Sequence, residues 1–389
     1  MQFDVIKAID GQKTLKVNDI FLYSKYKPIQ DAERWIDKEF DDSADSYILI
    51  GLGLGYHLSY LATKTRKNIY VLYFDKNELA IAEENIPLYA SHIHIVSHLS
   101  DLHINKKMQV LIHHAWVQIM KSNTKVYEIL DTMKRNQISF KKFSGKMFLN
   151  ASENLKNYIP NYYPEKQSKT ACLVSSGPSL NETIHWLENN KDIEIFVVGS
   201  ALKVLLSNGV IPDAVVLTDA QDSIKKQLEG TNYKGTLYYL LTASAEAVKS
   251  HLGPKYLLCQ EGYTLAEEAA DKFNLPKLTT GGSVATTAFS LIEYMGYENI
   301  VLFGQDLGFT GNDTHVIGST SGKKVQTDFN VLANDGSYIN TQPNLQVYLR
   351  WFNEQCINTK MNVYNTAVKG AQIQNVPLIN KDEFEKLKA

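Results

Sequence analysis

The sequence has few cysteines, no long apolar run and no excess of charge of either sign. Its three cysteines, Cys172, Cys259 and Cys356, are widely separated. They lack the paired spacing of a metal clip or a disulfide framework, so we expect reduced core residues. No stretch reaches the roughly 18 apolar residues of a membrane helix, and no basic start followed by an apolar run resembles a leader. We therefore expect a cytoplasmic protein without a membrane span.

The charge balance argues against a polyanionic partner. Forty basic and 42 acidic residues give a formal net charge of −2, so the chain has no overall positive field that would attract nucleic acid. Hydrophobic residues make up 44% of the chain and charged residues 21%, which is typical of a folded globular protein. The length of 389 residues suggests two domains. A stretch with two prolines, 159–164, predicts a joint between domains at 1–165 and 166–389.

The first half reads as a Rossmann-like α/β unit. A predicted strand at 46–50 ends in a glycine turn, Gly51, Gly53 and Gly55, and a helix follows from His57. A second strand, 69–74, ends in Asp75, about 20 residues beyond Gly55, where dinucleotide folds place a ribose-binding acid. Two readings stay open: a methyl donor bound by these glycines and Asp75, or a fold that holds no ligand. Further strands are expected at 93–96 and 110–112.

A long helix is expected over 127–158. Its basic residues indicate a solvated face or a surface for an acidic protein partner, and they include Lys134, Arg135, Lys141, Lys142 and Lys146.

The second half alternates strands and helices, which predicts a parallel sheet. Strands are expected at 171–174, 195–198, 214–217, 237–241, 256–259, 300–303 and 362–364, and helices at 180–187, 202–206 and 284–295. Open parallel sheets bind ligands beyond the carboxyl ends of their strands, so the residues that follow these strands are the candidate site.

The first such segment is Ser175 to Ser179. Gly177 allows close backbone approach, and Ser179 with Glu182 matches the S-x-x-E capping pattern. The pattern allows two interpretations: exposed amides that hold a phosphate, or a helix cap without a ligand.

Other strand ends carry small or polar residues toward the same edge. These are Gly199 and Ser200, Thr218 and Asp219, Thr280 to Ser283, and Gly304 to Asp306. A glycine-rich loop beyond Asp306 carries His315, which could take up a proton near neutral pH. No metal-binding motif is present, although Asp219 or Asp306 could contact a magnesium ion.

Several strings in fixed order resemble the motility accessory factor (Maf) glycosyltransferases. They are SSGPSL, VVGSALKVLLSNGVIPDAVVLTDA, TTGGSVATTAFSLIEYMGYENIVLFGQDLGFTGNDTH and VYNTAVKGAQI, spanning about 170–373. The preceding IGLGLGYH resembles the N-terminal Rossmann-like domain of the same family. The family's central domain is similar to bacterial sialyltransferases and to an archaeal 6-hydroxymethylpterin diphosphokinase (MptE-like). The resemblance thus implies two Rossmann-like domains, the second with a sialyltransferase-like parallel sheet.

The resemblance also implies an activity: inverting transfer of a nonulosonic acid, such as pseudaminic or legionaminic acid, from CMP to a serine or threonine of flagellin or another acceptor. No obligatory cofactor is expected beyond this CMP-sugar donor. His315 would be the general base and Asp306 would organise the pocket floor. The implied donor-binding residues are Ser176, Gly177, Pro178, Ser179, Gly199, Ser200, Asp219, Thr280, Gly281, Gly282, Ser283 and Gln305. Backbone amides near Gly177 and Gly282 would stabilise the leaving phosphate.

One departure from the sialyltransferase pattern keeps alternatives open. Those enzymes have a tyrosine shortly after the G-x-D turn, where this chain reads Leu307-Gly308-Phe309. One alternative is a diphosphokinase that uses ATP and magnesium held by acids such as Asp219 and Asp306. The other is a non-catalytic nucleotide-binding adaptor of a flagellar glycosylation pathway.

Overall fold

The computed structural model describes residues 1–83, 90–97, 108–188, 192–322, 324–327 and 329–388. The chain forms two compact units, Met1–Ile138 and Ser139–Ala389. The division falls inside the long helix α5 (Thr124–Lys156). The proline-rich segment at which we expected the joint follows that helix within the second unit, because the second half of α5 packs with the second unit.

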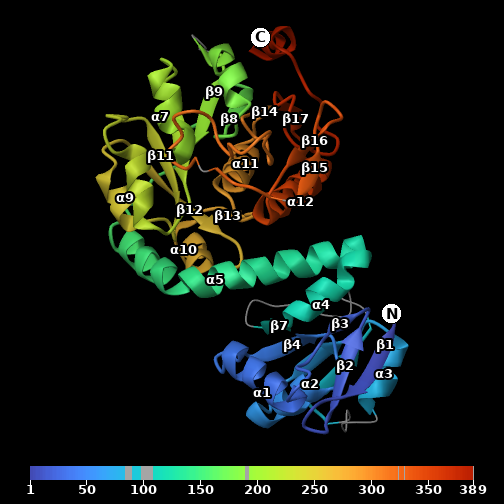
Figure 1. Ribbon diagram of the computed structural model, residues 1–389. Coiled ribbons are helices and arrows are strands. Elements are labelled where there is room, and N and C mark those ends of the chain that lie inside the picture. Colours follow the sequence, from blue (N-terminus) through green and yellow to red (C-terminus); the bar gives the residue numbers. More distant parts are fainter. Residues whose placement is uncertain (84–89, 98–107, 189–191, 323, 328, 389) are drawn as a thin grey trace. The chain divides into compact units, whose positions relative to one another are not determined.

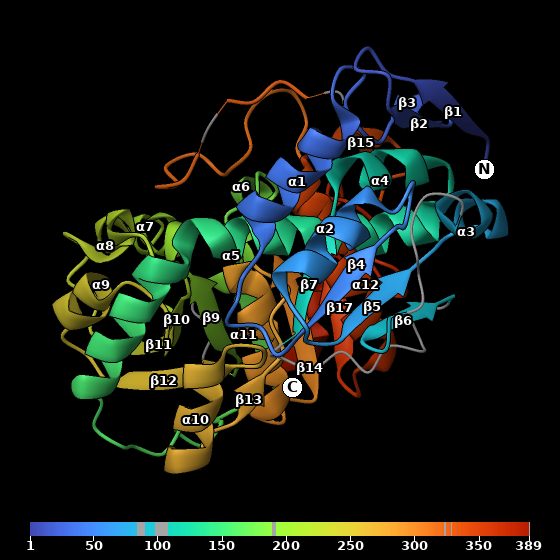
Figure 2. The same ribbon diagram turned by 90° about the horizontal axis from the view of Figure 1, so that it is seen from below.

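The N-terminal unit contains a four-stranded parallel sheet in the order β6-β5-β4-β7 (Figure 2). The strands are β4 (Ser46–Ile50), β5 (Ile69–Leu72), β6 (Ile93–Val96) and β7 (Met108–Ile112). The glycine turn joins β4 to α2 (Tyr56–Lys64), and α3 (Lys76–Glu83) follows β5. The strand order places β4 between β5 and β7, so the glycine turn lies at the point where the order of the strands reverses. The expected Rossmann-like unit is confirmed.

This unit also has elements that the sequence did not predict. A three-stranded antiparallel sheet, β1 (Phe3–Lys7), β2 (Lys13–Val17) and β3 (Ile20–Phe21), precedes α1 (Pro28–Glu39). Leu15 and Val17 of β2 are fully buried in the core of the unit. After β7 the chain continues as α4 (His114–Ile119).

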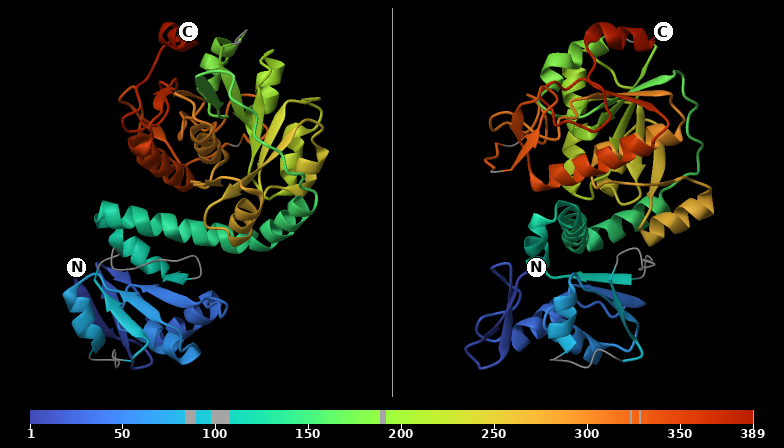
Figure 3. Two further views of the ribbon diagram at one scale, coloured as in Figure 1. Left: turned by 180° about the vertical axis from the view of Figure 1, so that it is seen from behind. Right: turned by 90° about the vertical axis from the view of Figure 1, so that its right-hand side faces the viewer.

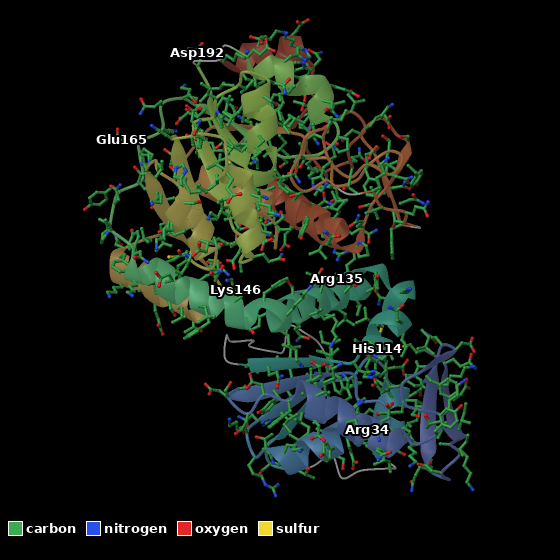
Figure 4. All side chains as sticks on the ribbon, turned by 60° about the vertical axis from the view of Figure 1, so that its left-hand side comes forward. Arg34, His114, Arg135, Lys146, Glu165 and Asp192 are labelled. Carbon is green, nitrogen blue, oxygen red and sulfur yellow. The ribbon has the colours of Figure 1, made fainter. Side chains whose placement is uncertain are left out.

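Two basic side chains of helix α5 have acidic partners. Within the helix, Arg135 donates two hydrogen bonds to Asp131, one turn earlier, at 3.0 and 2.9 Å. In the second unit, Lys146 forms an ion pair with Asp222 at 2.7 Å. Arg135 and Lys146 are labelled on α5 in Figure 4. Two of the expected basic residues therefore have acidic partners within the chain.

The C-terminal unit is built on an eight-stranded, all-parallel sheet in the order β13-β12-β11-β10-β9-β8-β14-β17 (Figure 1). Its strands are β8 (Thr170–Val174), β9 (Glu194–Val198), β10 (Ala214–Leu217), β11 (Thr236–Leu240), β12 (Lys255–Gln260), β13 (Lys277–Leu278), β14 (Asn299–Phe303) and β17 (Asn362–Asn365). The central strands are almost entirely buried, as their continuous apolar runs require when both faces are covered.

Helices cover both faces of this sheet. Helices α7 (Gly199–Ser207), α8 (Lys225–Leu228) and α9 (Ala245–Ser250) pack in sequence on one another, and α7 packs on β9 and β10. Helix α11 (Val284–Tyr294) packs on β8, β9, β10 and β13, and α12 (Pro343–Asn358), orange-red in Figure 3, packs on α11. Helix α10 (Thr264–Phe273) lies against β12 and β13. A short hairpin, β15 (Asn330–Leu332) and β16 (Tyr338–Asn340), precedes α12.

The remaining helical segments are short. The segment expected as a helix at 180–187 is α6 (Leu180–Thr183) followed by a 3₁₀ turn (Ile184–Leu187), and α13 (Lys381–Glu385) lies near the end of the chain. Cys172 and Cys259 are buried in the sheet as free thiols, and Cys356 is a half-buried free thiol. None of the described helices is long and apolar enough to cross a membrane.

Candidate functional site

The strand order of the C-terminal unit reverses between β8 and β14, and two loops meet there. The chain runs from β8 outward to β13 and then returns to β14 on the other side of β8. Such a switch point leaves a crevice beyond the carboxyl ends of the two strands. The residues that follow β8 and β14 are Ser175 to Ser179 and Gly304 to Asp306.

Three pairs of residues form four hydrogen bonds between these two loops. The Ser175 hydroxyl donates to Gln305 Oε1 at 2.5 Å. The Gly177 N–H donates to the carbonyl of Gly304 at 2.8 Å. The Ser179 N–H donates to Asp306 Oδ2 at 2.7 Å, and the Ser179 hydroxyl donates to Oδ1 of the same carboxylate. The two loops are thus fixed to each other at the switch point.

These bonds change our interpretation of the segment 177–179. The N–H groups of Gly177 and Ser179 already have acceptors in the chain, and Pro178 has no N–H, so they do not form the phosphate cradle that we expected. The Ser179–Glu182 capping pattern is also not used, since the Ser179 side chain makes no capping bond. A Cβ on residue 177 would lie 2.5 Å from the carbonyl oxygen of Gly304. Glycine is therefore required for the close contact of the two loops.

Asp306 is the buried acid of this site. It is only 4% exposed, and burial raises its pKa to about 6, although both bonds from Ser179 act in the opposite direction. Its backbone is also held, because the Ala371 N–H donates to the carbonyl of Asp306 at 2.7 Å. Asp306 fixes the position of the loop after β8.

Hydroxyl groups come together at the start of α7. Ser176 Oγ lies 2.8 Å from Ser200 Oγ, which joins the loop after β8 to the first turn of this nine-residue helix. The N-cap residue is Val198, which has no side-chain acceptor for the first N–H groups of the helix. A Cβ on Gly199 would lie 2.1 Å from Gln227 Oε1, so the glycine allows α8 to pack closely there. Two hydroxyls and a helix N-terminus suit an anionic group.

The loop that carries His315 crosses this pair of serines. The N–H of Val316 donates to the carbonyl of Ser176 at 2.8 Å, and the Ser319 hydroxyl donates to the carbonyl of Ser200 at 3.3 Å. His315 is half-buried, and its Nδ1 lies 2.7 Å from Thr314 Oγ1. Val316, the residue after His315, is therefore bonded directly to the loop that follows β8.

Asp219 and the turn Thr280 to Ser283 are linked through a residue that the sequence did not single out. The ring of Tyr348, on α12, lies 3.5 Å from the position of a Cβ on Gly282. Burial raises the pKa of Tyr348, and the charge of Asp219 adds to this effect. No local signal in the sequence marks Tyr348, because its position depends on the packing of α12.

The turn before α11 also differs from our expectation of free amides. The N–H groups of Gly281 and Ser283 both donate to Thr286 Oγ1, at 3.0 and 3.2 Å. The Ser283 hydroxyl in turn accepts from the Thr286 N–H, which completes a capping box. Two amides that we expected to face a phosphate are thus used inside the turn.

No group of three or more potential metal ligands occurs among the residues that the structure describes. Asp219 accepts a bond from the Gln221 N–H at 2.9 Å, and both oxygens of Asp306 accept from Ser179.

Comparison with known proteins gives matches over the segment that carries this site. The family model described as 6-hydroxymethylpterin diphosphokinase MptE-like matches residues 145–312. A solved Maf glycosyltransferase from Magnetospirillum magneticum AMB-1 superimposes with a TM-score of 0.54 and 15% identity, covering 98% of this chain and 71% of that one. The chain has a Maf-type fold. This confirms the expected arrangement of two Rossmann-like units.

One protein relative also matches across both units of the Maf-type fold. It is an uncharacterized protein of Treponema pallidum (strain Nichols), 25% identical over 350 residues. The match covers 81% of this chain and 61% of the relative, so the chain spans less than two thirds of that protein.

Proposed function

We propose that the chain is a glycosyltransferase that moves a nonulosonic acid from CMP to a hydroxyl of flagellin or another acceptor, with inversion. One observation carries this proposal: the bond from the Val316 N–H to the Ser176 carbonyl brings the His315 loop onto the serines that suit a phosphate. A base and an anion site side by side are what a displacement at an anomeric carbon requires. The Maf-type fold supports the same choice of chemistry.

The proposed reaction assigns a role to each group. His315 takes the proton of the acceptor hydroxyl as its oxygen attacks the anomeric carbon. The bond from that carbon to the phosphate oxygen breaks, and CMP leaves with the electron pair. The Ser176 and Ser200 hydroxyls and the first N–H groups of α7 stabilise the charge that develops on the phosphate. Thr314, bonded to Nδ1, orients the imidazole.

Asp306 acts in this proposal as a positioning residue. Its carboxylate holds the loop that presents Ser176 and does not face the reacting atoms. Tyr348, which lies against Gly282 of the turn at 280–283, and Asp219 would bind the nucleoside.

The test is transfer measured by mass spectrometry with CMP-activated nonulosonic acids and a flagellin acceptor. Replacing His315 by alanine should lower turnover about 10²- to 10⁴-fold, the usual contribution of a positioned base, and should leave CMP affinity unchanged. His185→Ala is the matched control, because His185 is exposed on the 3₁₀ turn after α6. Unchanged turnover in His315→Ala would remove this residue from the mechanism.

A diphosphokinase is the second candidate, favoured by the MptE-like match at residues 145–312. It would transfer diphosphate from ATP to a pterin alcohol with magnesium. Turnover of ATP and 6-hydroxymethylpterin that requires magnesium would establish it in place of sugar transfer. Tight CMP binding without turnover in either assay would instead indicate an adaptor.

A further inference from the structure

The glycine turn of the N-terminal unit has a carboxylate of its own chain bound to its amides. Glu78, in the first turn of α3, accepts from the N–H of Leu52 at 2.5 Å and from the N–H of Gly53 at 2.7 Å through Oε1. Its Oε2 accepts from the N–H of Phe74 at 2.7 Å. Both the turn after β4 and the end of β5 thus donate to this one side chain.

Side chains also fill the space around the turn. A Cβ on Gly51 would lie 2.1 Å from Trp116 Nε1, and Trp116 is fully buried. A Cβ on Gly53 would lie 2.4 Å from Leu22 and 2.6 Å from the hydroxyl of Tyr23. The same hydroxyl accepts from the N–H of Leu54 at 3.1 Å. The glycines are therefore needed for contacts within the chain.

In a Rossmann turn, these N–H groups and the crevice at the switch point receive the phosphate or carboxylate of a ligand. Here the amides of residues 52, 53 and 54 all have acceptors within the unit, and Trp116 lies against Gly51.

We infer that the turn Gly51–Gly55 is an anion site whose ligand is the Glu78 carboxylate, so that the N-terminal unit takes no nucleotide or methyl donor. Removing this carboxylate leaves a site of matching chemistry, which small carboxylates such as formate and acetate fill. The unit therefore serves the chain as a structural module.

Burial and the three N–H donors act on the charge of Glu78 in opposite directions. The side chain is 0% exposed, and burial raises its pKa to about 7, while the three N–H donors favour the charged form. A carboxylate that is removed from water needs such hydrogen-bond donors to keep its charge. The neighbouring charge of Asp75 raises the pKa further.

Hydrogen exchange of the full chain, read by mass spectrometry over the peptide that contains Leu52 and Gly53, tests the inference. In Glu78→Ala these amides should exchange at least about tenfold faster than in the wild type, because each loses a charged acceptor. Added sodium formate or acetate should restore slow exchange in this variant and have no effect on the wild type. Glu83→Ala, at the exposed end of the same helix, is the matched control and should behave as the wild type.

A second variant keeps the test decisive if Glu78→Ala does not fold. In Glu78→Gln the amide oxygen can still accept from Leu52 and Gly53, but the NH₂ group faces the Phe74 N–H, so exchange should rise most at Phe74. Equal exchange at Phe74 in Glu78→Gln and the wild type would overturn the inference. Protection of residues 51–55 in the wild type by millimolar S-adenosylmethionine, NAD or ATP would also overturn it.

Discussion

The carboxylate of Asp306 accepts both the backbone N–H and the hydroxyl of Ser179, across the switch point of the sheet. One acid from the loop after β14 thereby fixes the loop after β8. This relationship gives the buried acid at the switch point a structural partner on the neighbouring loop.

Asp306→Asn should destabilise the C-terminal unit by about 1.5–3 kcal/mol, the range for buried hydrogen bonds to a charged group. The asparagine NH₂ would face one of the two donors of Ser179. Thermal unfolding measures this loss, and Ser179→Ala, which removes only the hydroxyl, should cost less. If Asp306→Asn were as stable as the wild type, the carboxylate would not hold the loop.

Ser176 and Ser200 should act as a unit in donor binding. Each Ser→Ala variant should weaken CMP affinity, and the double variant should lose less than the sum of the single losses because the hydroxyls lie 2.8 Å apart. Calorimetric titration of CMP into the wild type, the two single variants and the double variant gives the coupling free energy between the two hydroxyls. Strictly additive losses would indicate that the two hydroxyls do not share one anion.

Thr314→Val should lower turnover and leave CMP affinity unchanged. Valine keeps the shape of threonine but removes the hydroxyl 2.7 Å from His315 Nδ1, so the ring loses its orienting partner. The pH dependence of kcat should shift, since a lost hydrogen bond changes the proton affinity of the imidazole. Thr320→Val, in an exposed part of the same loop, is the control. An unchanged pH profile in Thr314→Val would contradict the orienting role.

The sequence predicted every strand of the two parallel sheets except β13, because these strands are short apolar runs that end in small or polar residues. Val197-Val198 before Gly199 is such a case. Strand β13 has only two residues, Lys277–Leu278, which is too short to form such a run. The sequence also did not predict the antiparallel strands at 3–21, where charged and apolar residues are mixed.

The hydrogen-bond partners of the site residues depend on long-range packing, which local sequence patterns do not reveal. Ser179 matched a capping pattern with Glu182, yet its hydroxyl bonds Asp306 because β14 returns beside β8. Glu78 lies only three residues beyond the acid that the Rossmann pattern singled out. Its role depends on α3 pointing it back at the turn after β4.

The N-terminal unit should lose stability in mild acid. The rings of His57 and His113 lie 5.2 Å apart, and both contact the ring of Trp35. Burial lowers the pKa of His57 to about 3 and that of His113 to about 2, and the charge of His57 adds to the effect on His113. The folded unit therefore keeps both rings neutral, whereas the unfolded chain protonates them near pH 6.5.

Acid lowers the stability of the folded unit because each histidine takes up a proton on unfolding. Each histidine contributes stability above about pH 6.5 that is lost as the pH falls toward its folded pKa, with a slope of up to about 1.4 kcal/mol per pH unit. Glu78 acts in the opposite direction, because its pKa is raised to about 7; its contribution is present below about pH 4.5 and is lost as the pH rises through 7. Between about pH 5 and 6.5 the two histidines outweigh the one carboxyl, so the free energy of unfolding should rise with pH in this range.

Denaturant unfolding of the full chain at several pH values between 5 and 6.5 measures this slope for the N-terminal unit, with hydrogen exchange at residues 46–50 as the local readout. His113→Gln should reduce the slope by about one proton, because glutamine does not titrate. His185→Gln, on an exposed turn of the other unit, should leave the slope unchanged. A wild-type slope of zero, or one that His113→Gln does not alter, would mean that the buried rings do not remain neutral.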